Sequence, residues 1–304
     1  MDRWTEFELF VQTAELKSLS RASEILDISN ATATRMLNSL EARLDARLVE
    51  RNTRGLALTE VGEAFYLRCK CILEEMKDAE AAANATSLEP SGLLRITGSQ
   101  ASCMKFIVPM LPRFAELYPD IDIELVSANR YFDLIENGID VAIRTREYEP
   151  DNNITVRKLA ATRRILAASP AYLARHGTPR TIEELQRHKF LLYTYMNRPN
   201  ELHLTRGGES RDIKVGSSLQ ANDGQLLREA ALNGSGVLVQ IAALIHDDIE
   251  AGLLAPIMNE WDLPRLTINI AYRTRKHLPA KVRVFIDFMV EYFRQMDSEK
   301  KWTN

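Results

Sequence analysis

The chain has 304 residues, of which 45% are hydrophobic and 27% are charged, and its formal net charge is −3. This composition is typical of a globular protein, and the length favours two or three domains. The sequence shows no bilayer-length apolar run and no secretory signal, and its three cysteines form no Cys-x-x-Cys pair. We therefore expect a cytoplasmic protein without a membrane partner, whose total charge does not by itself indicate nucleic-acid binding.

The first 45 residues have the hydrophobic spacing of three helices. Apolar residues between Trp4 and Ala14 recur every three or four positions, which predicts an amphipathic helix. Ser20 is expected to cap a short second helix, and Ser29 a third after a tight turn. Two helices joined in this way are typical of a helix-turn-helix motif.

The outward residues of the third helix are suited to contact DNA bases. The second helix of such a motif enters the major groove, where Asn can pair with adenine and Arg with guanine, and Ala can touch a thymine methyl. The candidate DNA contacts on these two helices are Ser20, Arg21, Asn30, Ala31, Thr34, Arg35 and Asn38. Spacing alone also allows an ordinary helical hairpin with a polar solvent face.

Two short strands are predicted next, at 48–51 and 56–58, around a turn. Arg51, Thr53 and Arg54 lie at or beside its tip, where arginines can reach phosphates or a narrow minor groove. A basic hairpin directly after a recognition helix is a wing. This segment therefore favours DNA binding over the plain hairpin.

A long helix is expected from a cap at Thr59 to about Ala85. Its apolar residues follow a heptad, which is typical of a coiled coil: Phe65, Cys69, Ile72, Met76, Ala79, Ala83 and Thr86. The alternative is an amphipathic helix that packs on its own domain. Cys69 is expected to be a small core residue rather than a redox sensor. Pro90 and Gly92 mark a domain boundary.

Strands and helices alternate from Leu93 onward, which predicts parallel sheets with covered faces. Strands are expected at 93–98, 121–127, 140–144, 190–195, 213–215 and 267–272, and helices at 104–118, 132–137, 182–188, 224–233 and 280–296. Ligands of such sheets bind beyond the carboxyl ends of the strands. Ser99–Ser102 follow the first strand, where hydroxyls, an amide and free N–H groups at a helix start predict an anion site. Ser99 and Asn222 could equally be helix caps alone.

Long segments of the chain resemble the LysR-type transcriptional regulators, and most of all the CrgA-like subgroup. In the N-terminal region the matching segments are 18–26, 28–30, 40–44 and 51–62, and later ones are 134–144, 168–179 and 285–288. The resemblance covers residues 1 to about 296. Asn30, Ala33 and Thr34 depart from the family pattern, where Gln, Val and Ser are usual, so the base preference is open.

The resemblance implies an α+β protein with three parts. These are a winged helix-turn-helix domain at 1–59, a dimerising linker helix at 60–90, and an effector-binding domain at 91–304 that is similar to a periplasmic binding protein. The effector domain would have two α/β lobes, lobe I at 91–160 plus 267–304 and lobe II at 161–266. Facing loops would line an effector cleft, with these candidate residues: Ser99, Gln100, Ala101, Ser102, Arg144, Tyr195, Asn222 and Asp223.

The implied function is sequence-specific regulation of transcription. Homodimers, or tetramers and larger oligomers, would bind an interrupted palindrome in double-stranded DNA, and a small organic acid such as a carboxylate would change their arrangement. RNA polymerase would be a partner if the protein activates. No cofactor is implied.

Two rival functions are compatible with parts of the sequence. One is a solute-binding protein whose N-terminal helices serve assembly, which the arginine wing and the lack of an export signal disfavour. The other is a cytoplasmic enzyme, disfavoured because the sequence has no metal-ligand spacing, nucleophile elbow or Walker loop. We therefore expect neither catalytic nor metal-binding residues. Gly234-Ser235-Gly236 is predicted to stop a helix, and a basic cluster is predicted to be solvated surface: Arg273, Arg275, Lys276, His277, Lys281 and Arg283.

Overall fold

A computed structural model describes residues 2–52, 55–83, 89–129, 133–134, 137–146, 154–273, 278–296 and 299–303. The chain divides into two compact units. The N-terminal unit comprises Met1–Leu88 with the short segment Asp133–Ile139, and the C-terminal unit comprises Glu89–Phe132 with Asp140–Asn304. Each unit is described separately below.

The N-terminal unit begins with the three predicted helices, α1 (Arg3–Leu16), α2 (Leu19–Ile25) and α3 (Asn30–Leu44). Ser29 caps α3 as predicted, because its Oγ accepts the Thr32 N–H at 3.2 Å. The predicted cap at Ser20 is wrong. Ser18 caps α2, since its backbone is extended and its Oγ accepts the Arg21 N–H at 3.3 Å, so the helix starts before Ser20 is reached.

One small core holds these helices together. Buried apolar residues on the inner faces of all three helices are joined by Leu48 and by Cys69 of the following long helix. Asp27 makes the tight turn between α2 and α3 with a left-handed φ of 50°, a conformation that Asp tolerates better than most side chains. The helix-turn-helix layout is therefore confirmed.

The predicted hairpin is present as β1 (Val49–Asn52) and β2 (Gly55–Leu58), which pair antiparallel with Val49 opposite Leu58. It leads into α4 (Glu60–Ala83), and Thr59 caps α4 as predicted by accepting the Gly62 N–H at 2.9 Å. A Cβ added at Gly62 would lie 2.0 Å from the backbone oxygen of Leu48. This close approach explains why a glycine stands in the first turn of α4.

The predicted heptad seam of α4 is only partly free for a partner. Cys69 is 1% exposed, and the Phe65 ring lies 5.8 Å from the Phe7 ring and 5.6 Å from the Phe10 ring, so both seam residues pack on their own unit. Ile72 is 41% exposed. The alternative of a helix covering its own domain therefore holds for the first turns. Thr86 lies outside the described residues, as do the side chains of Ala79 and Ala83.

In the C-terminal unit, the first sheet has the order β4-β3-β5-β14-β6. We call the region around it lobe I; its strands are β3 (Gly92–Gly98), β4 (Ile121–Ser127), β5 (Val141–Arg146), β6 (Ile154–Thr162) and β14 (Leu266–Arg273). β4, β3 and β5 are parallel, but β14 is antiparallel to both of its neighbours. The sheet is therefore mixed rather than purely parallel as predicted, because β14 returns to it from the second lobe.

The second sheet has the order β11-β8-β12-β7-β13 and defines lobe II. Its strands are β7 (Arg164–Ala168), β8 (Lys189–Tyr193), β11 (Gly216–Ala221), β12 (Val237–Ile241) and β13 (Ala255–Ile257), with a separate hairpin of β9 (Glu201–Arg206) and β10 (Glu209–Lys214). The helices between them are α7 (Pro170–His176), α8 (Ile182–Arg187), α9 (Gly224–Leu232) and α10 (Ala242–Glu250). Gly234 stops α9 as predicted, with a φ of 76°.

The predicted helix at 104–118 is interrupted. It consists of α5 (Gln100–Ser102), a π-helical turn at Cys103–Ile107, a 3-10 turn at Val108–Met110, and α6 (Leu111–Leu117). Pro109 and Pro112 lack N–H donors, which prevents a regular α ladder here. Of the helix predicted at 132–137, residues 132, 135 and 136 lie outside the described residues, and Asp133, Leu134 and Asn137 are not helical.

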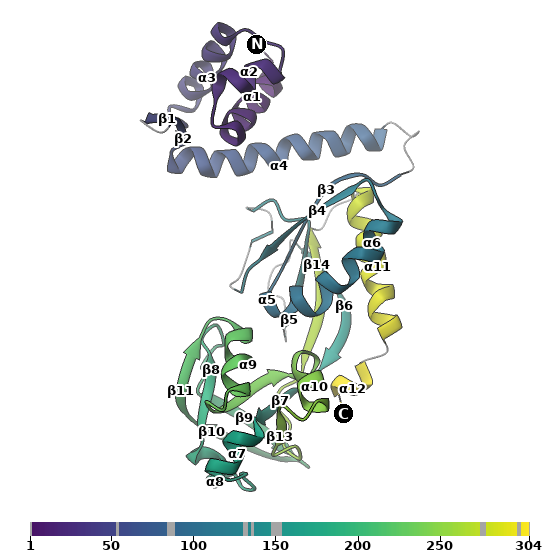
Figure 1. The fold of residues 1–304 in the computed structure, drawn as a ribbon. Helices are drawn as coiled ribbons and strands as arrows, with labels where there is room; N and C mark the ends of the chain where they lie inside the picture. The colour runs from purple at the N-terminus through teal and green to yellow at the C-terminus, as the bar shows by residue number, and fades with distance from the viewer. Residues whose placement is uncertain are drawn as a thin grey trace. The chain divides into compact units, whose positions relative to one another are not determined.

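The main core of the C-terminal unit draws on both sheets. Ile96 and Val141 of lobe I share one buried cluster with Leu191 and Leu238 of lobe II. The terminal helices α11 (Ala280–Met296) and α12 (Glu299–Thr303) close this core, and Figure 1 shows α11 beside the first sheet. The Trp302 ring lies 5.8 Å from that of Phe106. Lys281 is 5% exposed, so the predicted solvated basic cluster is wrong at this position; residues 274–277 are not described.

Candidate DNA-binding surface and effector cleft

The predicted DNA contacts on α3 share one exposed face. The exposed residues are Asn30, Ala31, Thr34, Arg35 and Asn38, and Ser20 and Arg21 are exposed on α2. Ala33, Met36, Leu37 and Leu40 are buried on the opposite side of α3. The helix thus has the two-faced character that a major-groove reader needs.

Asn30, the first residue of α3, is anchored by a side chain that the sequence did not reveal. Ser23 of α2 is 1% exposed, and its Oγ lies 2.9 Å from Asn30 Oδ1 and 2.8 Å from the Ser20 carbonyl. This contact holds the Asn30 side chain against α2.

Two arginines near α3 are held by carboxylates. Arg43 Nη2 lies 2.5 Å from Glu6 Oε2, and Arg47 Nη1 lies 3.1 Å from Glu41 Oε2. Among the described side chains, Arg35 has no ion-pair partner. Arg51 lies on β1, but its side chain is not described, and Thr53 and Arg54 lie outside the described residues.

Glu41 connects α3 to the wing, a role that the sequence did not indicate. It is 7% exposed, and its Oε1 accepts the N–H groups of Leu48 at 2.8 Å and Val49 at 3.2 Å. A carboxylate in this position orients the first strand of the wing relative to the end of the recognition helix. Burial of an acid on an otherwise polar stretch has no local sequence signal.

A cavity of about 900 Å³ is lined by residues from both lobes of the C-terminal unit. It includes five of the eight predicted effector residues: Ser99, Ala101, Ser102, Arg144 and Tyr195. Its volume lies within the range of small-molecule pockets. The predicted facing of the β3 and β5 ends toward lobe II is therefore present.

Gln100, Asn222 and Asp223 are not among the residues that line this cleft. Asp223 is 6% exposed and caps α9 by accepting the N–H groups of Gln225 at 2.7 Å and Leu226 at 3.0 Å. Asn222 Nδ2 donates to the Tyr195 hydroxyl at 3.4 Å. Asn222 therefore contacts Tyr195 of the cleft lining, and Asp223 caps a helix whose first residue, Gly224, also lines the cleft.

The anion site predicted at the start of α5 is not built as expected. The Gln100 N–H donates to Asn129 Oδ1 at 3.2 Å, and the Ser102 N–H donates to Ser99 Oγ at 3.2 Å. These donors are already satisfied because Ser99 caps the helix and Asn129 reaches it from the end of β4. Ser99 is therefore a cap that also lines the cleft.

The positive charge of the cleft comes mainly from residues that sequence reasoning missed. Arg146 and Arg164 join Arg144 in its lining. One carboxylate, Glu201, also lines it, but Glu201 lies 3.2 Å from Arg198 Nη1 and 3.6 Å from Lys214 Nζ. The lining has a local excess of guanidinium groups. Arg146 directly follows Arg144 and Thr145 in sequence, so continuing the β5 strand by two residues would have found it.

Polar groups without charge complete the cleft. Thr145 Oγ1 is buried and has no hydrogen-bond partner within the described part of the chain, which leaves it available to a ligand. The Tyr193 hydroxyl donates to the Asn129 carbonyl at 3.3 Å. Burial, with smaller contributions from Asp223 and Tyr195, raises the pKa of Tyr193, so this hydroxyl stays protonated as a donor.

Metal-binding clusters and membrane-spanning helices are both absent from the described part of the chain. There, no three His, Cys, Asp or Glu side chains are placed to hold a metal ion. None of the helices in the same ranges has the length and apolar character needed to cross a membrane.

Comparison with known proteins agrees with this geometry. Residues 4–63 match the model of bacterial regulatory helix-turn-helix proteins of the lysR family, and residues 87–294 match the LysR substrate binding domain. The chain is 35% identical to the transcriptional regulator CrgA of Neisseria meningitidis over 94% of this chain and 95% of CrgA. It is 32% identical to a transcriptional regulator of Xanthomonas campestris over 93% and 83% of the two chains.

Solved structures of LysR-type regulators also match the chain over nearly its whole length. The structure of CrgA matches with a TM-score of 0.63 and 34% identity, covering 95% of this chain and 98% of that one. The full-length virulence activator AphB of Vibrio cholerae matches with a TM-score of 0.62 and 32% identity over the same shares. These relatives are transcription regulators rather than enzymes. The chain, with its DNA-binding helix-turn-helix and its effector-binding domain, therefore belongs to the LysR family of bacterial transcription regulators.

Proposed function

We propose that a small anionic effector binds in the cleft between the two lobes and controls how the N-terminal unit binds its operator. The observation that carries this proposal is the lining of the cleft. Three arginines line a cavity of about 900 Å³ together with the Thr145 hydroxyl, which has no hydrogen-bond partner among the described residues. Guanidinium groups match carboxylates in charge and geometry, so a small organic acid is the ligand class we assign.

The DNA contacts are proposed on α2, α3 and the wing. On α2 and α3 they are Ser20, Arg21, Asn30, Ala31, Thr34, Arg35 and Asn38, which the exposure of these side chains supports. On the wing we assign Arg51, Thr53 and Arg54 to the phosphate backbone or the minor groove. Arg35, which is exposed and has no ion-pair partner among the described side chains, is the residue we assign to base recognition.

The proposed active species is a homodimer or a larger oligomer on an interrupted palindrome. Val61, Leu67 and Ile72 of α4 are 55%, 43% and 41% exposed, and a second copy of this helix would cover them. We assign residues 1–59 to the DNA-binding domain, 60–90 to the linker and 91–304 to the effector domain, with lobe I at 91–160 plus 267–304 and lobe II at 161–266. The cytoplasm is the proposed location, and RNA polymerase is a partner if the protein activates.

A fluorescence-anisotropy titration tests the link between cleft and operator. The DNA is the intergenic region beside the protein's own gene, and a panel of small carboxylates is added at constant ionic strength. An active carboxylate is expected to shift the affinity of the wild type for this DNA. Arg146→Gln and Thr145→Val should weaken that response, whereas Arg180→Gln, an exposed arginine outside the cleft lining, should not. A response that survives both cleft changes would overturn the effector site.

Base recognition is tested separately. Arg35→Ala is expected to lose about 1–3 kcal/mol of discrimination between the operator and unrelated DNA, while Arg54→Ala should weaken both alike and flatten the salt dependence. Identical behaviour of the two variants would contradict this division of roles. If neither the wild type nor any variant binds this DNA at low salt, the intergenic region does not contain the operator.

A further inference from the structure

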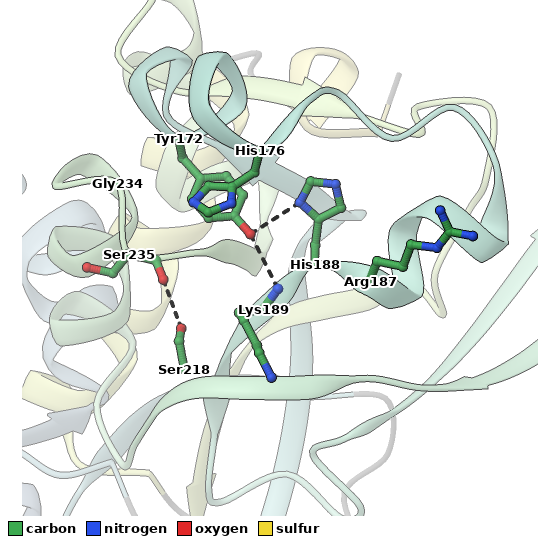
Figure 2. Close-up of a pocket in the computed structure, with 8 residues that line it drawn as sticks. All are labelled: Tyr172, His176, Arg187, His188, Lys189, Ser218, Gly234 and Ser235. Atoms are coloured by element: carbon green, nitrogen blue, oxygen red, sulfur yellow. Dashed lines mark hydrogen bonds between the residues drawn. The ribbon is translucent and has the colours of Figure 1, made fainter.

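A second cavity, of about 300 Å³, lies within lobe II and shares no lining residue with the effector cleft. Figure 2 shows its walls, which come from α7, the junction of α8 and β8, β11 and the turn that follows α9. Four of its eight lining residues have basic side chains, namely His176, Arg187, His188 and Lys189, and none is a carboxylate.

Two buried polar side chains form the fixed part of this cavity. Tyr172 is 3% exposed and His188 is 7% exposed. The Lys189 N–H donates to the Tyr172 hydroxyl at 3.3 Å, and the same hydroxyl lies 3.2 Å from His188 Nδ1 (Figure 2). Among the described residues, Nδ1 is the acceptor available to the Tyr172 hydroxyl hydrogen, so we assign the hydroxyl as the donor of this contact. With Nδ1 as the acceptor, the hydrogen of the neutral imidazole is on Nε2.

The neutral His188 imidazole is therefore a hydrogen-bond donor through Nε2. Burial and the neighbouring His176 lower its pKa, with Glu184 opposing them. Nε2 has no hydrogen-bond partner among the residues that the structure describes. The His176 ring packs on Tyr172 with 4.5 Å between ring centroids, which holds a second imidazole beside the first.

Two permanent cations flank this pair. Arg187 and Lys189 are exposed and extend in different directions from the backbone on either side of His188 (Figure 2). No described carboxylate lies within ion-pair distance of either one. Ser218 on β11 is tied to the opposite wall, since its Oγ donates to the Ser235 carbonyl at 2.8 Å. The cavity thus combines a rigid N–H donor with two unpaired cations on flexible stems.

We propose that this cavity binds the phosphoryl group of a small molecule, either inorganic phosphate or a small phosphorylated metabolite. A doubly charged oxyanion that accepts from His188 Nε2 also attracts Arg187 and Lys189, whose flexible stems can turn toward it, whereas a neutral ligand gains no such attraction. The site is independent of the carboxylate cleft, and it gives lobe II a ligand of its own.

Isothermal titration calorimetry of the full-length protein tests this proposal. Sodium phosphate, glycerol phosphate and sodium acetate are titrated separately at matched ionic strength. Saturable binding of phosphate is expected, and the double variant R187Q/K189Q should weaken it about tenfold or more through loss of two charge-assisted contacts. The matched control is Arg180→Gln, which removes an exposed arginine of the same lobe outside the cavity lining.

The titrations identify the ligand or overturn the proposal. Tighter binding of glycerol phosphate than of phosphate assigns a phosphorylated metabolite, and the reverse assigns the free anion. Equal binding of acetate, unchanged binding in R187Q/K189Q, or no binding of either phosphate compound overturns the proposal. Arg146→Gln in the cleft should leave phosphate binding unchanged, so failure of this site and failure of the carboxylate site are distinguishable.

Discussion

Asn129 Nδ2 donates a hydrogen bond of 2.6 Å to Asp223 Oδ2, and this bond joins the end of β4 in lobe I to the N-cap of α9 in lobe II. Asn129 also accepts the Gln100 N–H through its Oδ1 at 3.2 Å, and its carbonyl accepts the Tyr193 hydroxyl at 3.3 Å. One amide therefore connects both walls of the effector cleft. Asp223, which is predicted as a ligand contact, anchors this connection.

Asn129→Ala should destabilise the C-terminal unit by about 1–2 kcal/mol, because a hydrogen bond to a carboxylate in a partly buried place is lost. Urea unfolding followed by tryptophan fluorescence measures the change. Asn233→Ala is the matched control, since it removes an amide whose bond to the Glu229 carbonyl at 2.8 Å stays within one helix end. An equal loss of unfolding free energy in the two variants would show that the bond between the lobes stabilises the unit no more than a bond within one helix end.

Glu41→Ala should destabilise the N-terminal unit by about 2 kcal/mol, because it leaves the N–H groups of Leu48 and Val49 without their acceptor. Glu41→Gln keeps one oxygen acceptor and should lose less. Thermal unfolding gives the stabilities, and operator affinity reports whether the wing has moved. Glu63→Ala, an exposed acid on α4, is the control. A ranking with Gln worse than Ala would contradict the acceptor role.

Gly62→Ala should destabilise the N-terminal unit by about 2 kcal/mol or more, although helix propensity alone favours Ala by about 1 kcal/mol. The added Cβ would lie 2.0 Å from the Leu48 oxygen, which is backbone and cannot move aside cheaply. Circular dichroism during heating measures the result. Ala64→Gly on the same helix should lose only the propensity difference. Stabilisation by Gly62→Ala would mean that β1 and α4 do not approach this closely.

The buried cysteines should be inert at neutral pH. Burial raises the pKa of Cys69 from 9.0 to about 12 and that of Cys103 from 9.0 to about 11. Folding therefore favours the neutral thiols, and this contribution to stability is complete below pH 9 and is lost as the pH rises toward 11–12. A thiol reagent at pH 8 should label Cys71 first and the other two only on unfolding. Equal labelling rates for all three would contradict the burial.

The N-terminal unit was the part best predicted from the sequence, because its signals are local. Helix spacing, the cap at Ser29 and the hairpin at 49–58 depend on neighbouring residues, and all are present. The cap of α2 is predicted too late in the chain, at Ser20, because the extended backbone that makes Ser18 the cap is not visible in the sequence.

The cleft was less predictable because its polar residues come from distant strands. Arg146 lies on β5, Arg164 on β7 and Gln240 on β12, and no spacing in the sequence brings them together. The sequence indicates no strand at β6 or β7, so the residues that these strands carry could not be placed. Burial decides the roles of Ser23 and Glu41 in the same way, since each looks like an ordinary surface residue in its local sequence.

The core that contains both Ile96 of lobe I and Leu238 of lobe II has a mechanical consequence. Two lobes with separate interiors could swing apart on flexible connections at little cost. Here a wide opening would expose apolar surface from both sheets, so we expect an effector to act through small shifts of packed side chains. We therefore expect the C-terminal unit to unfold in a single thermal transition. We also expect the effector's signal to pass through it without a large hinge motion between the two lobes.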